Sequence, residues 1–511
     1  MNIIIPCSGV GKRFQDAGYG TTKPLIPIHF SKLHTILGEV VQQFSPEEDK
    51  FIFIANKENV DDIFEWVQSW SSHFYPDMDC TVTSVDHKKL GPVGALFDAL
   101  DDLRRFVRKD EGIIVSYCDF GAIFDYKSFK EFVKDDSACI MSYTGYHPHL
   151  QNPKNVYAVP IMVDDRYVSH VYEKHFIEVE DRKNFHHSSG AYYFKHFTTF
   201  THYVSEMMTR GETLNGEYYV SLLMNLLIDD EFKVSSWAGI KYFYQLGTPE
   251  DLNIFREQYK KYYNSKFRLI ENLFENQVML MAGRSERFTQ AGYLAPKPFM
   301  KIRDQQMHLI QESNLFASYR RYVTADDYVD YTVGSDRNYK FIEKNKVGPA
   351  YSYFLGANDI KGEVIITSCD IFCEYDSYDF TSSKDKFDVI VFATQNHSQS
   401  LKNPKSFSWI DHTGPIVHSV SLKKPLNEKA DKEDYLLIGS FWVKNNEKFI
   451  KIVKDFLGVQ KPDGGEYYLD EVINYCLLEG LSVGTALVNG YYSFGTPDEY
   501  LESKYWLECF R

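Results

Sequence analysis

Short apolar runs alternate with segments of helical character along the first half of the chain. Residues 2–7 read NIIIPC, residues 51–55 read FIFIA and residues 112–116 read GIIVS. Runs of this length without a polar face are typical of strands that are buried on both sides of a parallel sheet. Residues 59–70 and 94–107 are expected to be helices, the latter because its leucines and valines recur on one face. The alternation predicts an α/β fold with a mostly parallel sheet and helices on both faces.

The second half of the chain repeats this pattern and many of its letters. VMLMA at 278–282 and GEVIITS at 362–368 match the first and third runs. Further blocks recur in the same order. They begin at residues 9 and 283 (Gly-rich turn), 91 and 348 (GP), 116 and 367 (ending in CD), 216 and 465 (GEYY), and 246 and 494 (GTP). The separation between matching positions falls from 274 residues at the first block to 248 at the last. Such a drift is expected of a duplicated domain that has lost residues in its second copy.

The repeat predicts two tandem domains of one fold. A period of roughly 250 residues is far above the 20–50 residues of solenoid repeats. We expect the first domain over 1–257 and the second over 276–511. Residues 258–275 contain no Pro or Gly, which predicts a stiff connecting helix between them.

Composition narrows the functional classes. The 511 residues carry a net charge of −15, which argues against general nucleic-acid binding. The eight cysteines contain no CxxC pair, so reduced thiols are expected rather than a zinc site. No apolar run approaches the 18–20 residues of a membrane span, and the chain starts directly with a strand-like segment rather than a signal. A cytoplasmic protein is therefore expected.

The Gly-rich turn after the first strand carries phosphate-binding chemistry. Gly9 and Gly11 allow the backbone to approach an anion, and backbone N–H groups can cradle phosphate oxygens. Arg13 adds a bidentate donor, and Lys23, which precedes Pro24, adds a point charge. The segment lacks GK[ST] and a third glycine, so it is neither a P-loop nor a Rossmann fingerprint. The alternative is a structural turn with surface cations. Because the same set recurs in the second copy, phosphate binding is favoured.

Asp119 lies three residues after the buried strand predicted at 112–116. Ligands of open α/β sheets lie at the carboxyl ends of strands, where a carboxylate can hold Mg²⁺ against phosphates. The alternative role is a turn cap, but Asp370 follows a similar strand in the second copy, which favours the metal. The string Asp119-Phe120-Gly121 resembles a kinase DFG. No HRDxxxxN motif precedes it, so the kinase interpretation fails.

The order of motifs GxGxRF, KPL, GPxxAL, CDF, SGxYxF, GEYY and LGTPEDL resembles the nucleotidyltransferases that make activated sugars. The similarity is to the sugar-1-phosphate nucleotidyltransferases and the small capsule-type cytidylyltransferases. It covers nearly all of residues 1–255 and, more loosely, 276–505. The resemblance implies two three-layer α/β/α domains of the GT-A/Rossmann-like type. It also implies Mg²⁺-dependent transfer of a nucleoside monophosphate from an NTP to a phosphorylated small molecule, with release of pyrophosphate.

The resemblance also implies roles for individual residues of the first domain. The expected nucleotide-binding residues are Ser8, Gly9, Gly11, Lys12, Gly91, Pro92 and Gly94. The expected catalytic residues are Arg13, Lys23 and Asp119. The expected acceptor-binding residues are Glu173, Lys174 and Gly190. Many family members carry a second metal ligand, an Asp, two residues before the GTP tripeptide, but this chain has Gln245 there and Ser493 in the second copy. Glu217 is the substitute candidate beside Asp119; a charge at a helix N-terminus is an equally good interpretation of Glu217.

The second domain retains only part of this set. Its equivalents are Gly283, Arg287, Lys297, Asp370 and Glu466. Ser285 replaces the second loop glycine, Glu286 stands at the position of Lys12, and Lys423-Lys424 stands where the first copy has Glu173-Lys174. A carboxylate beside a triphosphate should repel it. Two hypotheses remain: a structural or regulatory copy, which we favour, or an active site adapted to another substrate.

The sequence thus favours a nucleotidyltransferase acting on a sugar phosphate for surface-glycan precursor synthesis, with CTP slightly preferred among the nucleotides. One alternative is a GT-A-type glycosyltransferase. That class usually needs DxD at the strand end, whereas Asp119 is followed by Phe120-Gly121. The other alternative is a non-catalytic nucleotide-sugar-binding protein, against which the intact Gly-rich loop and Lys23 argue. The sequence does not indicate an oligomeric state.

Overall fold

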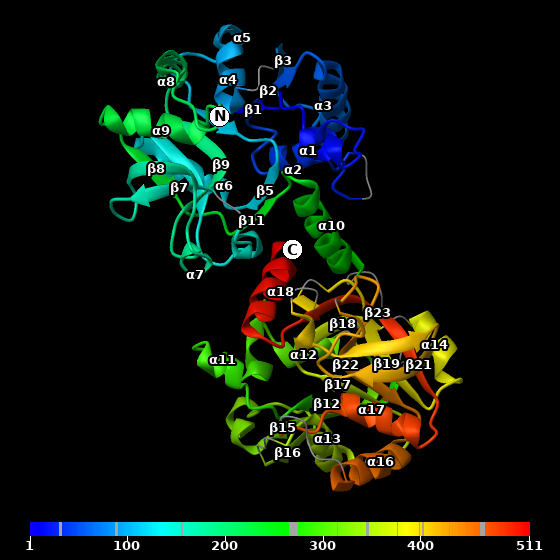
Figure 1. The fold of residues 1–511 in the computed structure, drawn as a ribbon. Helices are drawn as coiled ribbons and strands as arrows, with labels where there is room; N and C mark the ends of the chain where they lie inside the picture. Colours follow the sequence, from blue (N-terminus) through cyan, green and yellow to red (C-terminus); the bar gives the residue numbers. More distant parts are fainter. Residues whose placement is uncertain are drawn as a thin grey trace. The chain divides into compact units, whose positions relative to one another are not determined.

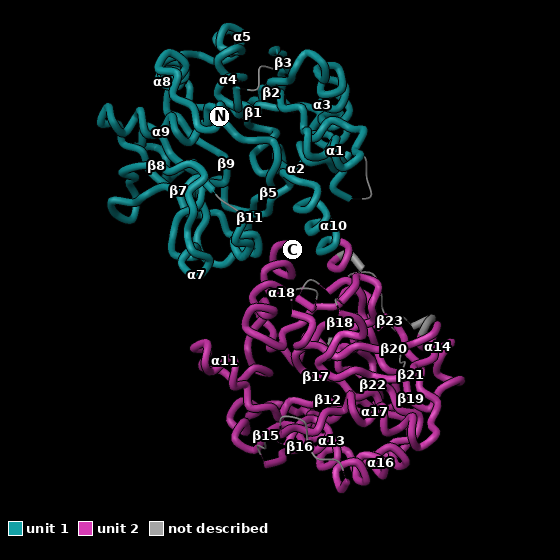
Figure 2. Tube along the Cα trace, in the orientation of Figure 1, with its two compact units in different colours: residues 1–259 teal, residues 260–511 magenta. Residues whose placement is uncertain are grey.

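The computed structural model describes the chain except residues 30–32, 87–89, 155–156, 265–273, 314, 344–346, 376, 398, 401–402, 429, 460–464 and 511. It forms two compact units, unit 1 (Met1–Tyr259) and unit 2 (Lys260–Arg511), which Figure 1 and Figure 2 show. The last helix of unit 1's fold, α10 (Pro249–Asn264), covers the start of the connecting helix predicted at 258–275. The rest of that prediction, over 265–273, lies outside the described residues.

A seven-stranded mixed sheet forms the centre of unit 1, in the order β10-β6-β9-β4-β1-β2-β3. Its strands are β1 (Asn2–Pro6), β2 (Lys50–Asn56), β3 (Cys80–Val85), β4 (Ile113–Ser116), β6 (Ala138–Tyr143), β9 (His187–Phe194) and β10 (Val234–Trp237). Strands β1 to β4 pair in parallel, as do β6 and β10, whereas β9 runs antiparallel to both of its neighbours. The three apolar runs predicted as strands are β1, β2 and β4.

Helices cover both faces of this sheet because its strands are apolar on both sides. Ile4 of β1 packs into one core, with helices α4, α5, α8 and α9, while Ile3 and Ile5 pack into the other, with α2, α3 and α6. All three isoleucines are fully buried. The helices of unit 1, apart from α10, are α1 (Lys12–Asp16), α2 (Ile36–Val41), α3 (Val60–Phe74), α4 (Gly91–Asp98), α5 (Leu100–Phe106), α6 (Tyr126–Phe132), α7 (Val179–Arg182), α8 (Phe197–Arg210) and α9 (Val220–Asp229). The predicted three-layer α/β/α fold is confirmed; the single helix predicted at 94–107 is wrong, since α4 and α5 are separate.

Unit 2 has the same order of main strands, β16-β15-β12-β17-β22-β19-β23, and β22 is the strand antiparallel to both neighbours. Its strands are β12 (Phe274–Met281), β13 (Lys301–Ile302), β14 (Gln305–Gln306), β15 (Ala317–Ala325), β16 (Tyr339–Ile342), β17 (Val364–Ser368), β18 (Ile371–Tyr375), β19 (Val389–Thr394), β20 (Trp409–Thr413), β21 (Ile416–Ser421), β22 (Tyr435–Val443) and β23 (Val483–Ser493). Its helices are α11 (Glu286–Gln290), α12 (Met307–Ser313), α13 (Pro349–Ala357), α14 (Ser377–Lys384), α16 (Asn446–Val459), α17 (Leu469–Leu478) and α18 (Pro497–Cys509). The seven strands of the unit 1 sheet therefore each have a counterpart in the larger sheet of unit 2.

Two smaller pairs of strands complete unit 1. Strands β5 (Phe120–Ile123) and β11 (Tyr242–Gln245) pair antiparallel, and so do β7 (Tyr157–Met162) and β8 (Val168–His175). In unit 2, β18 pairs with the end of the long strand β23, which takes the places of both β10 and β11. These additions lie beyond the carboxyl ends of the central strands, so they supply the walls of a site there.

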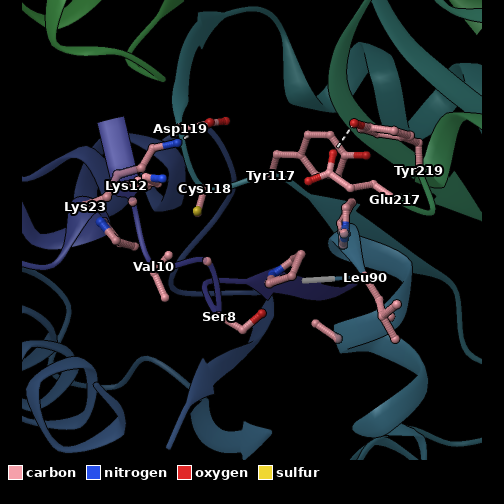
Figure 3. A pocket seen from close by; sticks show the side chains of 18 of the residues that line it. Ser8, Val10, Lys12, Lys23, Leu90, Tyr117, Cys118, Asp119, Glu217 and Tyr219 are labelled. Carbon is pink, nitrogen blue, oxygen red and sulfur yellow. Dashed lines mark hydrogen bonds and ion pairs between the residues drawn. The ribbon is translucent and has the colours of Figure 1, made fainter. Parts of the chain in front are cut away.

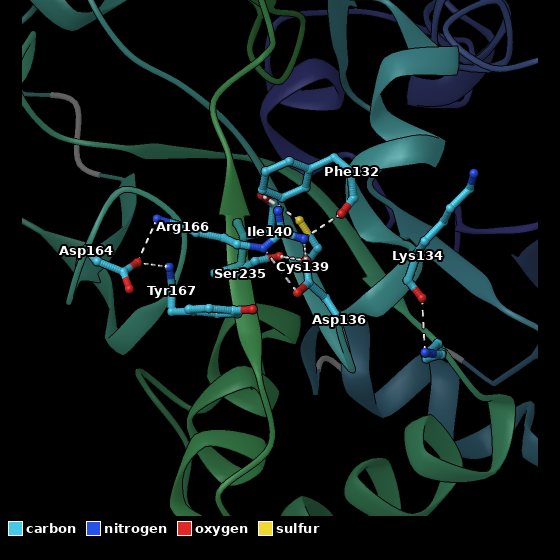
Figure 4. A network of polar contacts seen from close by, with 10 residues as sticks. Phe132, Lys134, Asp136, Cys139, Ile140, Asp164, Arg166, Tyr167 and Ser235 are labelled. Carbon is cyan, nitrogen blue, oxygen red and sulfur yellow. Dashed lines mark hydrogen bonds and ion pairs between the residues drawn. The ribbon is translucent and has the colours of Figure 1, made fainter.

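A buried ion pair fastens the β7–β8 hairpin to the main sheet of unit 1 (Figure 4). Asp136 is fully buried and accepts from Arg166 Nη2 at 2.8 Å and from Ser235 Oγ at 2.7 Å. Arg166 also donates to the Phe132 carbonyl and lies 4.0 Å over the Phe132 ring. Burial alone would lower the pKa of Arg166, but its contacts with Asp136 raise it. The hairpin tip is thus held to the main sheet by this pair and by a backbone hydrogen bond from Ser236 N to the Arg166 carbonyl at 2.9 Å.

The described residues include no helix that is long and apolar enough to cross a membrane. All eight cysteines are free thiols. Cys118 lines a pocket of unit 1.

Candidate active site

The Gly-rich turn joins β1 to α1 and is held in place by tertiary contacts. Gly11 has a φ of 64°, in the left-handed region that favours glycine. A Cβ atom at Gly11 would lie 2.8 Å from Cβ of Lys23, so a side chain there would push Lys23 away. The Ser8 carbonyl accepts from Asn56 Nδ2 at 3.0 Å. By contrast, Gly9 has open space in front of it, where a ligand can approach the backbone.

Lys23 and Asp119 form an ion pair at the centre of the site. Lys23 Nζ lies 2.6 Å from Asp119 Oδ2, and the two side chains are 18% and 33% exposed. Burial alone would lower the pKa of Lys23, but the carboxylate of Asp119 raises it. The Asp119 carbonyl accepts from Leu246 N at 2.9 Å, and Gly247 passes so close that its Cβ would lie 3.1 Å from Asp119 Oδ2. The β5–β11 pairing therefore fixes where this carboxylate points.

A pocket of about 550 Å³ opens above the turn (Figure 3). Ten of the predicted residues line it: Ser8, Gly9, Gly11, Lys12, Lys23, Gly91, Pro92, Gly94, Asp119 and Glu217. Its volume is within the 300–1,000 Å³ that is common for small-molecule sites. The structure thus gathers the predicted nucleotide-binding residues around one cavity.

The two ends of this larger pocket differ in charge. Its lysines, Lys12 and Lys23, belong to the end at the Gly-rich turn, and Figure 3 shows both on the side of Asp119. The other end is built from α4, whose first residue Gly91 has a φ of 76° and packs against the backbone of Tyr218. Asp98 lies on the same helix, seven residues or two turns after Gly91, and also lines the pocket. One end therefore suits phosphates, and the other a flat, largely apolar group with polar edges.

A second, smaller pocket of about 280 Å³ adjoins the first, and both are lined by Lys23, Tyr117 and Asp119. The predicted residues Arg13, Glu173 and Gly190 line it. Its other lining residues are Phe120, Tyr157, Ala158, Ser188, Ser189, Tyr192, Phe243, Gln245, Gly247, Thr248 and Asp251. The wall therefore combines aromatic rings with hydroxyls and carboxylates, which suits a polar organic group of sugar size.

Lys174 and Glu217 belong to a network that the sequence does not reveal. Lys174, at a φ of 54°, donates to the Tyr219 hydroxyl, which donates to Glu217. Lys174 Nζ lies 3.9 Å from Glu217 Oε2. Tyr219 lines the larger pocket, whereas Lys174 lines neither of the two pockets. Lys174 therefore touches the site through Tyr219, and Glu217 as a metal ligand stays a prediction.

Asp251 is a second carboxylate close to Asp119 that sequence analysis missed. It lines the smaller pocket and accepts from Thr248 Oγ1 at 2.6 Å. Burial raises the pKa of Asp251, and the charge of Asp119 raises it further. Among the described residues, no group of three or more His, Cys, Asp or Glu could hold a metal ion. The sequence did contain a signal for Asp251. It follows Thr248 by three residues at the start of a helix, which is a common capping pattern.

Arg182 holds together the two loops that flank the β7–β8 hairpin. It is 2% exposed, and its guanidinium donates to the carbonyls of Ile177, Leu150 and Asn152 at 2.8, 2.9 and 2.8 Å. A buried cation that is satisfied by carbonyls orders both loops at once. The sequence gives no signal for this role, because the three acceptors are backbone carbonyls, which every residue type has.

Unit 2 places its predicted residues in a comparable way. Lys297 Nζ lies 2.5 Å from Asp370 Oδ2, and Glu466 accepts from the Tyr468 hydroxyl at 2.5 Å. Gly283 and Arg287 lie in the turn after β12 and at the start of α11. The alignment of Lys424 with Lys174 is wrong.

The correct equivalent of Lys174 is Lys423, one residue earlier. Val171 and Val420 make the same pair of hydrogen bonds with the amides of Asn225 and Asn474. The lysine three residues after each valine donates to a tyrosine hydroxyl. Leu422 therefore stands at the position of Glu173, so unit 2 lacks that carboxylate.

No protein-family model matches the chain, and no curated protein matches it. Solved structures of low sequence identity do. The nucleoside-diphosphate-sugar pyrophosphorylase of Vibrio cholerae RC9 is 17% identical, with a TM-score of 0.40 over 50% of this chain and 99% of that chain. The inositol-1-phosphate CTP transferase of T. maritima is 15% identical, with a TM-score of 0.37 over 46% of this chain and 98% of that one. A UDP-glucose pyrophosphorylase is 13% identical, with a TM-score of 0.40 over 52% of this chain and 99% of its own. Each of these proteins is thus similar to about half of this chain.

Proposed function

We propose that unit 1 transfers a nucleoside monophosphate from an NTP to a phosphorylated small molecule and releases pyrophosphate. The observation that carries this proposal is the pair of adjoining pockets that share Lys23, Tyr117 and Asp119. The larger pocket fits a nucleotide with its phosphates at the Gly-rich turn. The smaller pocket fits the acceptor. Their shared wall would bring the acceptor phosphate next to the α-phosphate, which is the geometry that the reaction needs.

The residues of the shared wall would act by positioning and by neutralising charge. Backbone N–H groups near Gly9 and Gly11, with Lys12, would hold the phosphates that leave. Lys23 and Arg13 would offset the charge on the α-phosphate and the incoming phosphate. An oxygen of the acceptor phosphate attacks the α-phosphorus, the bond from that phosphorus to the bridging oxygen breaks, and pyrophosphate leaves. The nucleophile is already anionic, so no general base is needed.

The donor set also fits a Mg²⁺ ion. Mg²⁺ commonly takes one or two carboxylates and completes its shell with phosphate oxygens and water. Asp119 would supply one carboxylate, with Asp251 or Glu217 as the second. Bound there, the ion would neutralise negative charge on the phosphates. Lys23, released from its pair with Asp119, would then be free to contact phosphate.

The far end of the larger pocket supports an amino-bearing base, and CTP remains our choice. Asp86 and Asp98 line the pocket with carboxylates, which accept hydrogen bonds. Cytosine presents an amino donor at the position where thymine presents a carbonyl acceptor. The motif resemblance to the capsule-type cytidylyltransferases points the same way.

A sugar phosphate is the acceptor that the smaller pocket supports best. Glu173, Ser188 and Ser189 offer partners for hydroxyl groups, and Tyr117 and Tyr192 offer aromatic surface for the ring. The product would be an activated sugar for surface-glycan assembly, made in the cytoplasm where NTPs are available. We further infer that the two units arose by duplication, which the matching strand orders and the repeated motifs support.

Pyrophosphate release tests the proposal. Purified chain with Mg²⁺ would be assayed with CTP, UTP, GTP, ATP and dTTP against a panel of sugar phosphates and phosphocholine, beside Asp119→Asn. The expected result is release that depends on one NTP and one acceptor and is lost in Asp119→Asn. Nucleotide binding without release for any pair would favour the binding-protein alternative. Sugar transfer from a nucleotide sugar without pyrophosphate would favour the glycosyltransferase.

A further inference from the structure

Unit 2 repeats the charged centre of unit 1 with nearly the same geometry. The distance from Lys297 Nζ to Asp370 Oδ2 is 2.5 Å, against 2.6 Å for Lys23 and Asp119. The Lys297 and Asp370 side chains are only 21% and 17% exposed. Burial alone would lower the pKa of Lys297, but Asp370 raises it. A copy that served only as structural support would need no half-buried ion pair at its strand ends, because apolar residues pack there at no cost in desolvation.

Ser285 and Lys423 of unit 2 have left-handed conformations at positions that match residues of the unit 1 site. Ser285 has a φ of 57° at the position of Gly11, and Lys423 has a φ of 52° at the position of Lys174. Side chains other than glycine disfavour this region, and such residues gather at functional sites. Ser285 Oγ accepts from the backbone N–H of Lys297 at 2.9 Å, so the serine ties the turn to the lysine segment. The shape of the phosphate turn has thus been kept despite the loss of its glycine.

The charge that seemed to exclude phosphate from unit 2 is compensated. Glu286, at the position of Lys12, lies 3.3 Å from the guanidinium of Arg284, which stands where unit 1 has Val10. Arg287 is exposed, as is its equivalent Arg13. Gly283, like Gly9, has open space in front of its backbone. The turn of unit 2 therefore presents one ion pair and a further cation, beside Lys297.

The base end of unit 2 has kept its backbone and changed its side chains. Gly348 has a φ of 110° and packs against the backbone of Tyr467, as Gly91 packs against Tyr218. On α13, Tyr351 stands at the position of Gly94 and Leu355 at that of Asp98. An aromatic ring has replaced a glycine, and an apolar side chain has replaced the carboxylate. These changes alter the surface that a base would meet, whereas the Lys297–Asp370 pair and the left-handed turn remain.

We infer that unit 2 is a second nucleotide site, which binds the phosphates of an NTP through Arg287 and Lys297, with Asp370 as the carboxylate that would hold Mg²⁺ there, and which selects a different base from unit 1. This inference rests on the proposed function for its assignment of the phosphate turn. It replaces our sequence-based preference for a purely structural copy.

Calorimetric titration of the full chain tests it, with Mg²⁺ and each of CTP, UTP, GTP, ATP and dTTP in turn, and without acceptor. Arg13→Ala and Arg287→Ala form a matched pair of variants. Both arginine side chains are exposed, so both variants should fold. We expect Arg13→Ala to retain one NTP per chain, with a base preference other than that of unit 1. Adding Arg287→Ala should weaken this binding about 10- to 100-fold, the loss expected for a charge-assisted contact. Asp370→Asn should weaken it as well.

The inference is overturned if none of the five nucleotides shows binding that responds to Arg287→Ala or Asp370→Asn. It is also overturned if Arg13→Ala alone removes all binding. In both cases pyrophosphate release that is lost in Asp119→Asn would leave the proposed function of unit 1 intact. Absence of that release in the assay above would count against the proposed function instead.

Discussion

In unit 1 the β7–β8 hairpin is a two-stranded sheet of its own, whereas in unit 2 the β20–β21 hairpin joins the main sheet through both strands. Strand β20 pairs with β22, with Trp409 opposite Leu436, and β21 pairs with β23 at Ile416 and Gly484. Unit 1 has instead an isolated backbone bridge, between Tyr167 and Ser235 of β10, with the Arg166–Asp136 pair beside it. The same strand order thus permits two ways of closing the acceptor side of the site.

The acceptor sides also differ in which element supplies a buried carboxylate. In unit 1 Glu173 of β8 accepts from Ser221 of α9 at 2.5 Å. In unit 2 the acid lies on the helix, where Asp470 of α17 accepts from Ser408 at 2.5 Å. Burial raises the pKa of both acids. The lysine–aspartate pair is thus alike in the two units, whereas the hairpin side differs. Under our proposal this is expected if the two units share a nucleotide chemistry but not an acceptor.

The largest effect should come from breaking the Arg166–Asp136 pair of unit 1, because its carboxylate is fully buried. Arg166→Met leaves the fully buried Asp136 without its cation. We expect a loss of roughly 3–5 kcal/mol in the free energy of unfolding. Urea unfolding, followed by fluorescence, measures it. Arg104→Ala, which breaks the exposed pair with Asp101, is the control and should cost less than about 0.5 kcal/mol. Equal effects of the two variants would show that the hairpin does not depend on this pair.

Removal of the central lysine should identify the unit that performs the chemistry. Lys23→Ala is expected to lower kcat roughly 100- to 1,000-fold, since one preorganised charge at the reacting phosphate is removed. Lys130→Ala is the control, because Lys130 is a partly exposed lysine that pairs with Glu48 and lines neither pocket. The readout is pyrophosphate release at saturating substrates. If Lys297→Ala caused this loss and Lys23→Ala did not, the reaction would belong to unit 2.

Exchange of the turn residues compares the two phosphate loops directly. Gly11→Ser places a Cβ 2.8 Å from the position of Lys23 Cβ and imposes left-handed strain. We expect a stability loss of about 1–3 kcal/mol together with reduced turnover. Ser285→Gly relieves the same strain but loses the hydrogen bond to Lys297 N, so its net effect should stay within about 1 kcal/mol. A turnover of Gly11→Ser equal to wild type would mean that the turn and Lys23 are not held as described.

The smallest expected effect is the pH dependence of the stability that Asp370 gives to unit 2. Burial alone would raise the pKa of Asp370, but Lys297 lowers it below the ordinary value of about 3.9. A lowered carboxyl pKa adds stability above the ordinary value, and this stability is lost as the pH falls through the lowered pKa. Asp370→Asn should therefore reduce stability by about 1 kcal/mol at pH 6 and by less as the pH approaches 2. A difference that is constant from pH 6 to pH 2 would contradict the lowered pKa.

The sequence by itself determined the fold class and most of the phosphate side. Apolar runs such as NIIIPC become buried parallel strands because nothing polar limits them to one face. Gly11 lies in a turn that passes close to Lys23, where a side chain does not fit easily. The glycine motif of the turn can therefore be recognised in a single sequence. The repeated order of motifs likewise anticipated two sheets of one strand order. These features depend on neighbours along the chain or on spacing, which a sequence displays.

Only the tertiary structure decided the acceptor side. Lys23 and Asp119 are 96 residues apart, and their 2.6 Å contact exists because β1 and β4 are adjacent. Two further sets of contacts join segments that are far apart in the sequence and share no regular spacing. They are the network of Lys174, Tyr219 and Glu217, and the ion pair of Arg166 with Asp136. That Lys423 is the equivalent of Lys174 became clear only from the hydrogen bonds that Val171 of β8 and Val420 of β21 make. Long-range contacts of single side chains are set by how elements pack, and no periodicity in the sequence records that packing.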